Sequence, residues 1–289
     1  MPKVSCIMSC YKCNKEYLKK TIESILNQSF TDFEYIIADD KFNDFDLKSF
    51  IESFHDNRIK FYDNGKNLGY SLTHSKLFDN AKGEYIALVD SDDISHKDRL
   101  KLCIQEFEKN KSLDLVSGRI HIFGACRERD DGKEMKSKEV SDELLFYDPI
   151  KNPTVMLKRS TVEKYNMRYS DDYKGAGDYE LYSRFRNKLH YRILNDILVD
   201  YRKTGSNMTS DKSLFRRDHA RIIQRNLKDI GIDAPMDLCE MLDPYNHDIK
   251  DNGKEMMKIF ESYKDVIVNN TCLALFNRKL TSMVEKCKK

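Results

Sequence analysis

The feature that most restricts the fold of this chain is a regular alternation of short apolar runs with longer amphipathic stretches. The apolar runs predict strands at 4–8, 33–38, 58–62 and 84–89. Apolar residues at helical spacing predict helices at 17–26, 47–54, 71–81 and 97–107. Parallel strands need crossover connections of this kind, which cover both faces of a sheet. The pattern therefore predicts an α/β fold, Rossmann-like, with a mostly parallel central sheet and helices on both faces.

The pattern changes after residue 112. Strands are predicted at 113–118, 120–123, 154–157 and 191–199, a helix at 178–188, and a charged, mobile stretch at 127–139. Beyond residue 203 the chain reads as irregular and then helical, with a long amphipathic segment at 254–287. We expect one α/β domain over 1–205, followed by a basic loop and a C-terminal helical region over 206–289. This region would pack on the domain or form the seam of a homodimer.

Composition excludes several classes of protein. The 50 Lys and Arg nearly balance the 48 Asp and Glu, which argues against a nucleic-acid coat. No stretch approaches the roughly 18 apolar residues of a membrane span, and the first residues lack the pattern of a signal peptide. The eight cysteines are spread along the chain rather than set at the spacing of a disulfide framework. We therefore expect a cytoplasmic protein with reduced thiols, without a transmembrane segment or a nucleic-acid partner.

Cys10 and Cys13 form a CxxC pair directly after the first predicted strand. A structural zinc site would need a second pair or histidines at ligand spacing, and the sequence has neither. A thioredoxin-like pair would open a helix after a strand, which this pair loosely does. The redox interpretation stays open as a minor alternative.

Carboxylates gather at the predicted strand ends and at the start of one predicted helix. The groups are Asp39 with Asp40, Asp90 with Asp92 and Asp93, and Asp178. Ligands of open α/β sheets bind beyond the carboxyl ends of the strands. An Asp-x-Asp at such an end suits Mg²⁺ or a similar hard cation, which takes one or two protein carboxylates and leaves places for phosphates and water. The alternative is that these residues cap helices or form solvated turns.

Several short motifs in order resemble family 2 glycosyltransferases with the GT-A fold. They are 4–11, 18–40, Asn67-Leu-Gly69, 81–86, Asp90-Ser-Asp-Asp93 with 98–100, 152–156 and 177–184. Each string alone is weak, but their order and spacing make the resemblance specific through about residue 205. The opening is similar to that of the spore-coat polysaccharide type.

The resemblance implies inverting transfer of a sugar from a nucleotide donor, most simply a UDP-sugar, to a glycan or protein acceptor. Ser9 and Tyr11 would line the nucleotide pocket, with Tyr11 stacked on the base, and Asp40 would contact the base edge. Asn67 would belong to the same donor site. Asp92 would bind Mn²⁺ or Mg²⁺, Asp90 would lie near the ribose or the metal, and Asp178 would be the general base. The chemistry agrees, since an attacking hydroxyl must lose its proton and the leaving diphosphate gathers negative charge.

The chain departs from the family pattern in two places. Gly177 precedes the expected base where many relatives have Glu, and Thr204 stands where a histidine often ligates the metal. His219 is the one substitute, with a surface histidine as the alternative. Residues 201–225 carry seven Lys and Arg, including Arg216 and Arg217. They would form either a lid over the diphosphate or a solvated helix face.

Three competing functions remain at this level. A nucleotidyltransferase would normally have a glycine-rich loop after the first strand, and residues 9–13 contain no glycine. A phosphatase with an Asp-x-Asp nucleophile would carry that motif on its first strand rather than its fourth. A non-catalytic sugar-nucleotide-binding protein would not need to keep both Asp92 and Asp178.

Overall fold

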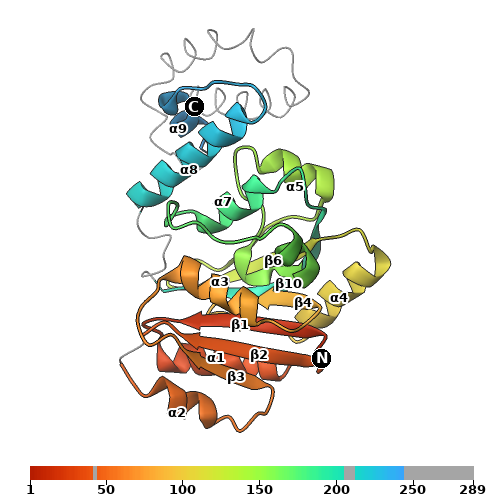
Figure 1. The fold of residues 1–289 in the computed structure, drawn as a ribbon, viewed down its shortest axis with the longest axis vertical. Coiled ribbons are helices and arrows are strands. Elements are labelled where there is room, and N and C mark those ends of the chain that lie inside the picture. Colours follow the sequence, from red (N-terminus) through yellow and green to blue (C-terminus); the bar gives the residue numbers. More distant parts are fainter. Residues whose placement is uncertain (42–43, 205–211, 244–289) are drawn as a thin grey trace. The chain divides into compact units, whose positions relative to one another are not determined.

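The computed structural model describes residues 1–41, 44–204 and 212–243 (Figure 1). The chain divides into two compact units, each built from separate stretches of sequence. The first unit comprises Met1–Ser137, Ile150–Asp171 and Lys188–Asn207, and the second comprises Lys138–Pro149, Asp172–Asn187 and Met208–Lys289. The domain boundary expected near residue 205 stays a prediction, and the amphipathic segment at 254–287 lies outside the described residues.

A ten-stranded sheet forms the centre of the first unit, with the strand order β3-β2-β1-β4-β9-β6-β10-β5, while β7 pairs with β6 and β8 with β10. The strands are β1 (Val4–Cys10), β2 (Phe33–Asp39), β3 (Ile59–Asp63), β4 (Tyr85–Leu88), β5 (Ile94–Ser95), β6 (Leu115–Gly124), β7 (Arg129–Asp131), β8 (Met135–Lys136), β9 (Met156–Lys158) and β10 (Tyr191–Lys203). Strand β1 pairs in parallel with β2 and β4, β2 with β3, and β6 with β10. Strand β9 is antiparallel to both of its neighbours. The predicted, mostly parallel sheet is confirmed.

Both faces of the sheet centre are covered. Every residue of β4 is buried, and β1 and β2 each have a single half-buried residue. Since alternate residues of a strand point to opposite faces, continuous burial means that apolar material packs on both sides. The helices of this unit are α1 (Lys15–Leu26), α2 (Leu47–Glu52), α3 (Tyr70–Asn80), α4 (Arg99–Lys109) and α6 (Arg159–Lys164).

Helix α1 shows why these residues form the predicted elements. The Asn14 side chain caps the helix by accepting hydrogen bonds from the backbone N–H groups of Glu16 and Tyr17. Its buried residues recur every three or four positions and are Leu18, Thr21, Ile22 and Ile25. The sequence therefore sets both the start of the helix and the face that it buries.

Two sequence-based expectations in this unit are wrong. The strands expected at 113–118 and 120–123 are one strand, β6, because Gly118 continues the strand where a side chain would block its neighbour. A Cβ at Gly118 would lie 2.5 Å from the Leu198 side chain of β10. The stretch at 127–139, expected to be charged and mobile, contains β7, β8 and the start of α5. Met135 is buried there, and Lys151 pairs with Asp131 at 2.9 Å.

The second unit is helical in its described part. Its helices are α5 (Ser137–Glu143, beginning at the last residue of the first unit), α7 (Gly177–Arg184), α8 (Lys212–Lys228) and α9 (Met236–Leu242). Helix α8 buries Ile222, Ile223 and Leu227, which confirms the predicted apolar face. Across the described ranges, no helix combines the length and the apolar character that crossing a bilayer requires.

Candidate active site

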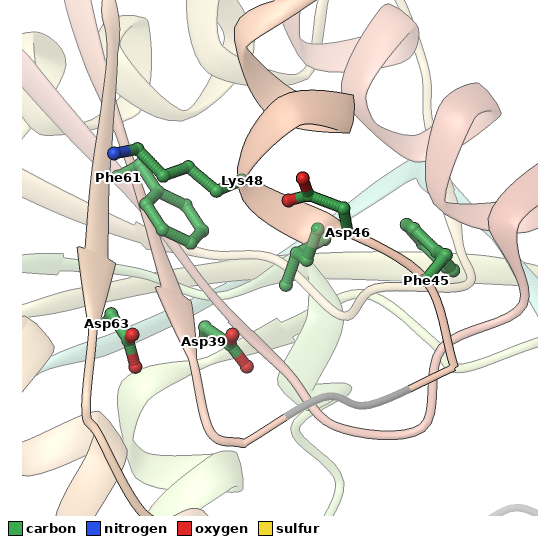
Figure 2. A pocket seen from close by; sticks show the side chains of 7 residues that line it. Asp39, Phe45, Asp46, Lys48, Phe61 and Asp63 are labelled. Carbon is green, nitrogen blue, oxygen red and sulfur yellow. The ribbon is translucent and has the colours of Figure 1, made fainter.

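The carboxyl ends of β3, β2, β1 and β4 lie at one edge of the sheet, because these four neighbours run in parallel. A cavity of about 460 Å³ opens at the ends of β2 and β3. It is lined by Asp39, Phe45, Asp46, Leu47, Lys48, Phe61 and Asp63. Figure 2 shows Asp39 and Asp63 beside each other at the ends of the two strands, where they are register partners. Acidic, basic and aromatic groups thus share one hollow where ligands of α/β sheets bind.

Asp40, the next residue, has a different environment from the one expected of a ligand contact. Its side chain is buried, and its carboxylate accepts hydrogen bonds from the N–H groups of Leu68 at 2.7 Å and Gly69 at 3.0 Å. Gly69 has a φ of +79°, a conformation that favours glycine. Asp40 therefore holds the loop that carries the exposed Asn67. Contact between Asp40 and a base stays a prediction.

The end of β1 presents Ser9 and Tyr11. Ser9 is half-buried, and 48% of Tyr11 is exposed. The Lys12 ammonium lies 5.1 Å from the centre of the Tyr11 ring. A large exposed ring at a strand end is a platform on which a planar group can stack, so this geometry is compatible with the role expected for Tyr11.

The acidic loop after β4 brings Asp90, Asp92 and Asp93 close together. Asp90 and Asp92 are half-buried, and only 3% of Asp93 is exposed. One Asp93 oxygen accepts a hydrogen bond from the backbone N–H of Arg202 at 2.8 Å, while its Oδ2 is buried with no hydrogen-bond partner among the described residues. Burial, and then the charges of Asp90 and Asp92, hold the pKa of Asp93 well above its usual range. Burial also raises the pKa of Asp92.

Arg202 fastens this loop to β10. Its Nε donates to the Asp92 carbonyl oxygen at 2.9 Å, and its guanidinium lies 4.1 Å and 4.4 Å from the ring centres of Tyr17 and Phe123. The sequence alone gave no signal for this role, because Arg202 is far from the acidic loop along the chain. The pairing of β10 with β5, which follows the loop directly, brings them together.

The acidic loop fits a hard divalent cation by its donor chemistry. In the part of the chain that the structure describes, no three His, Cys, Asp or Glu side chains are placed to share one metal ion. Mg²⁺ nevertheless takes one or two protein carboxylates and completes its shell with water and substrate phosphate oxygens. Three carboxyl groups lie close together here, and one of them has a buried oxygen without a described hydrogen-bond partner. When ionised they repel one another, and a bound cation would offset this negative charge.

Asp178 lies in the second unit, on the first turn of α7. It is half-buried, and its Oδ1 accepts a hydrogen bond from the N–H of Tyr179 at 2.8 Å. The role expected of Asp178 as the general base stays a prediction.

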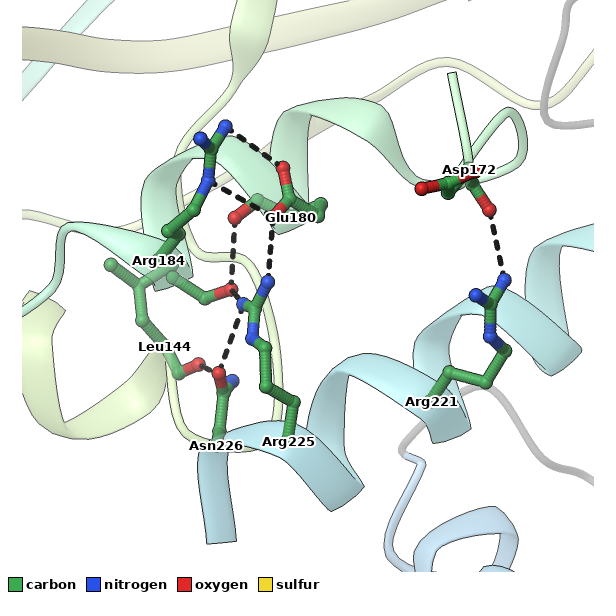
Figure 3. A network of polar contacts seen from close by, with 8 residues as sticks. Leu144, Asp172, Glu180, Arg184, Arg221, Arg225 and Asn226 are labelled. Atoms are coloured by element: carbon green, nitrogen blue, oxygen red, sulfur yellow. Dashed lines mark hydrogen bonds and ion pairs between the residues drawn. The ribbon is translucent and has the colours of Figure 1, made fainter. Parts of the chain in front are cut away.

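A polar network holds α7 to α8 (Figure 3). The buried carboxylate of Glu180 pairs with Arg184 at 3.1 Å and with Arg225 at 2.6 Å. Arg225 also donates to the Ser183 hydroxyl, and Asn226 donates to the Leu144 carbonyl oxygen at 2.9 Å. Because each charge has a partner of the opposite sign, this network is structural.

The basic residues expected in a loop lie mostly on α8. Arg221 donates to the Asp172 carbonyl oxygen at 2.8 Å, and Arg217 and Arg221 face the buried Asp218. The helix-face alternative therefore describes this part of the basic stretch, while 205–211 lie outside the described residues. Whether Arg216 and Arg217 contact a diphosphate stays a prediction.

His219 is not a surface histidine, as one of the two alternatives held. Only 3% of it is exposed, and its ring lies 4.2 Å and 4.8 Å from those of Phe215 and Tyr179. His219 lies on the apolar face of α8 and is buried within the second unit. Its use as a metal ligand remains untested.

Comparisons with known proteins identify the family of the chain. Residues 5–169 match the model of glycosyl transferase family 2. An uncharacterised glycosyltransferase of Methanocaldococcus jannaschii is 30% identical over 207 residues, which cover 70% of this chain and 71% of the relative. The poly(ribitol-phosphate) β-N-acetylglucosaminyltransferase TarP of Staphylococcus aureus is 29% identical over 77% of this chain and 70% of its own length.

Solved structures support the fold. The S. aureus TarS fragment 1–349, crystallised with UDP-GlcNAc, superposes with a TM-score of 0.63 at 18% identity, covering 90% of this chain and 73% of that fragment. The chain spans 42% of a longer TarS chain of the same fold. The fold is of the GT-A class, and the family match makes the protein a nucleotide-sugar-dependent glycosyltransferase. The chain belongs to glycosyl transferase family 2, which sets aside the nucleotidyltransferase and phosphatase alternatives.

Proposed function

We propose that the protein transfers a sugar from a UDP-sugar to a hydroxyl of a glycan or protein acceptor, with inversion at the anomeric carbon. The observation that carries the proposal is the edge shared by β3, β2, β1 and β4. A cavity, an exposed tyrosine and a loop of three carboxylates occur there on neighbouring strand ends. Support for UDP comes from the TarS fragment crystallised with UDP-GlcNAc, and for a glycan acceptor from the name of TarP.

Binding of the donor would use the strand ends of the first unit. Tyr11 would stack on the base, and Asp39, with Asp63, would accept hydrogen bonds from the nucleoside within the cavity. Asp40 would fix the loop that carries Asn67 by accepting hydrogen bonds from the N–H groups of Leu68 and Gly69. Ser9 lies on β1 beside these groups and would contact the same nucleotide.

Asp92 and Asp90 would hold Mn²⁺ or Mg²⁺. When bound, the cation neutralises charge on the leaving diphosphate as a Lewis acid. Arg202 keeps the loop in place through the Asp92 carbonyl and the Asp93 carboxylate.

Asp178 would accept the proton of the acceptor hydroxyl as that oxygen attacks the anomeric carbon. General-base catalysis of this kind contributes about 10²- to 10⁴-fold to the rate. The network around Glu180 and Arg225 would keep the α7 backbone rigid, so that the carboxylate holds one direction.

The test replaces Asp178 by Asn, which keeps the shape and removes the base. Transfer should fall by at least about a hundredfold, while the dissociation constant of the donor, measured by calorimetry with Mn²⁺ present, should stay within about twofold of wild type. Asp171→Asn, at an exposed carboxylate nearby in the chain, is the matched control and should change neither quantity. Turnover of Asp178→Asn near the wild-type rate would remove Asp178 from this role.

A thermal-shift screen of nucleotide sugars would identify the donor, since a ligand that binds only the folded state raises the melting temperature.

The cellular location and the oligomeric state of the enzyme are two further expectations. Six described cysteines are free thiols, which fits the expected cytoplasmic location. A homodimer through the C-terminal region is the remaining expectation, and the amphipathic segment at 254–287 lies outside the described residues.

A further inference from the structure

A pair of neighbouring thiols stands at the rim of the candidate donor site. Cys10 is the last residue of β1 and is fully buried, while Cys13 is half-buried and directly precedes Asn14, the cap of α1. The two thiols are hydrogen-bonded to each other. Lys12, between them, has a φ of +50°, a left-handed conformation that is uncommon for residues other than glycine.

Cys13 also touches the acidic loop. Its thiol donates a hydrogen bond to the Ser91 hydroxyl, with Sγ and Oγ 3.1 Å apart. Ser91 lies between Asp90 and Asp92, and the four-residue turn from Cys10 to Cys13 carries Tyr11. One sulfur atom therefore connects the aromatic platform of the site with its carboxylate loop.

The surroundings make Cys13 the reactive member of the pair. The hydrogen bond with Cys10 lowers the pKa of the Cys13 thiol, and the same contact, together with burial, raises the pKa of Cys10 well above its usual range. Thiolate character and exposure decide which cysteine an oxidant attacks. By contrast, Cys6 and Cys103 are fully buried, and burial raises the pKa of each to about 12.

We propose that Cys10 and Cys13 form a redox-reactive pair that closes to a disulfide and thereby weakens donor binding. The oxidant is a peroxide. The Cys13 thiolate attacks one oxygen of hydrogen peroxide, the O–O bond breaks, and a sulfenic acid and hydroxide form. The hydroxide takes up the proton that the thiol released and becomes water. The Cys10 sulfur then displaces the hydroxyl group of the sulfenic acid, which forms the S–S bond and releases a second water. Two thiols lose two electrons in all, and one peroxide becomes two waters.

Closure of the pair removes the contact with Ser91. A disulfide sulfur has no S–H to donate, and its geometry holds the sulfur near Cys10. Ser91 loses its restraint, and the turn that carries Tyr11 tightens. The weakening of donor binding rests on the proposed function, whereas the disulfide and the change at Ser91 do not.

The first experiment maps the bond in the full chain. The reduced protein is treated with hydrogen peroxide, the remaining thiols are alkylated after unfolding, and the digest is read by mass spectrometry. We expect Cys10 and Cys13 in a peptide that has lost two hydrogens and carries no alkyl group, with Cys6 and Cys103 alkylated. Recovery of both Cys10 and Cys13 in alkylated form overturns the proposal.

The second experiment reads the consequence without a donor. Amide hydrogen exchange in the peptide that contains Ser91 should become faster after oxidation and return to its original rate after reduction. The Cys13→Ser variant keeps an oxygen that can hydrogen-bond to Ser91 but cannot form the disulfide. Hydrogen exchange of its Ser91 peptide should therefore not change after treatment with peroxide. Cys126→Ser, at another half-buried cysteine, should respond as wild type does. Unchanged exchange in an oxidised wild-type protein overturns the coupling.

The third experiment measures the dissociation constant of the donor for the reduced and the oxidised protein. We expect oxidation to raise it roughly three- to tenfold, the effect of one lost hydrogen bond. An oxidised protein that binds donor as the reduced protein does contradicts the regulatory part of the proposal. If even the reduced protein binds no nucleotide sugar, the proposed function fails, and the mapping and exchange results decide the thiol pair by themselves.

Discussion

The acidic loop of the first unit and the α7–α8 network of the second differ in whether their buried charged groups have partners of the opposite sign. In the loop, Asp93 has a buried oxygen without a described partner, and its carboxylate neighbours repel it. In the network, the buried Glu180 lies between Arg184 and Arg225 (Figure 3). Keeping charges of one sign close together costs stability, and such an arrangement is typical of ligand sites. The network, with its charges matched, marks a place where the fold supports itself.

The largest expected effect concerns the loop. Asp92→Asn should lower the rate of transfer by about 10²- to 10³-fold, equal to about 2.7–4 kcal/mol, which is the typical loss when one group that stabilises transition-state charge is removed. The measurement is the initial rate at saturating donor with Mn²⁺. Asp32→Asn, at an exposed carboxylate, serves as the control. If Asp92→Asn keeps more than about a tenth of the wild-type rate, the loop does not hold the charge-neutralising group.

The second effect concerns a titratable group that the fold keeps neutral. His74 on α3 is buried, and burial lowers its pKa to about 4 from 6.5. Because the unfolded chain takes up the proton first as the pH falls, the contribution of His74 is fully present above pH 6.5. It is lost progressively towards pH 4, by up to about 3 kcal/mol.

Urea unfolding of wild type and His74→Gln across this pH range checks the effect. The variant should lose the part of the pH slope that His74 causes, whatever its stability at neutral pH. His55→Asn is the control, since His55 is exposed and its positive φ suits Asn. Equal slopes for wild type and His74→Gln would contradict a neutral buried imidazole.

The third effect concerns the network. Arg225→Met should lower the free energy of unfolding by about 2–3 kcal/mol, less than for a fully buried pair because a quarter of the Arg225 side chain is exposed and Arg184 remains. Removing both partners, in Glu180→Leu with Arg225→Met, should cost less than Arg225→Met alone, since the buried carboxylate is gone and the remaining Arg184 side chain is 37% exposed to water. A double variant at least as damaged as the single one would show that packing, rather than charge, holds α7 to α8.

The smallest effect is expected at a solvated pair in the same unit. Lys138 and Asp142 on α5 are 3.1 Å apart, and 86% of the Lys138 side chain is exposed. Lys138→Ala should change stability by no more than about 0.5 kcal/mol, and high salt should remove even that difference. A larger loss of stability in thermal unfolding would mean that exposed ion pairs in this unit contribute more to stability than expected.

Most of the fold of the first unit could be predicted because its signals are local. Apolar runs marked β1, β2, β3 and β4, and apolar residues at helical spacing marked α1. The merging of two expected strands into β6 could not be predicted, because the space that requires Gly118 is made by Leu198 on another strand. The pairing of β7 and β8 with the sheet depends on distant partners in the same way.

The candidate site divides along the same line. Asp90, Asp92 and Asp178 could be picked out because each follows a strand or opens a helix. Asp63 also follows a predicted strand, but neither Asp63 nor Phe45 was picked out, since the cavity exists only once β2, β3 and the start of α2 are side by side (Figure 2). The environment of Asp40 was also beyond the sequence, because its partners Leu68 and Gly69 come from the next loop.

The sequence by itself determined the family, the parallel sheet and the carboxylates at its edge, because periodicity and short motifs are properties of neighbouring residues. Only the tertiary structure decided which of these carboxylates have hydrogen-bond partners within the protein. Asp40 accepts hydrogen bonds from backbone N–H groups, while Asp93 has one oxygen without a described partner and two acidic neighbours that repel it. It also set the Cys13 thiol against both Cys10 and Ser91. Burial, charge partners and thiol contacts depend on residues far apart in the chain, which only the folded protein brings within hydrogen-bonding distance.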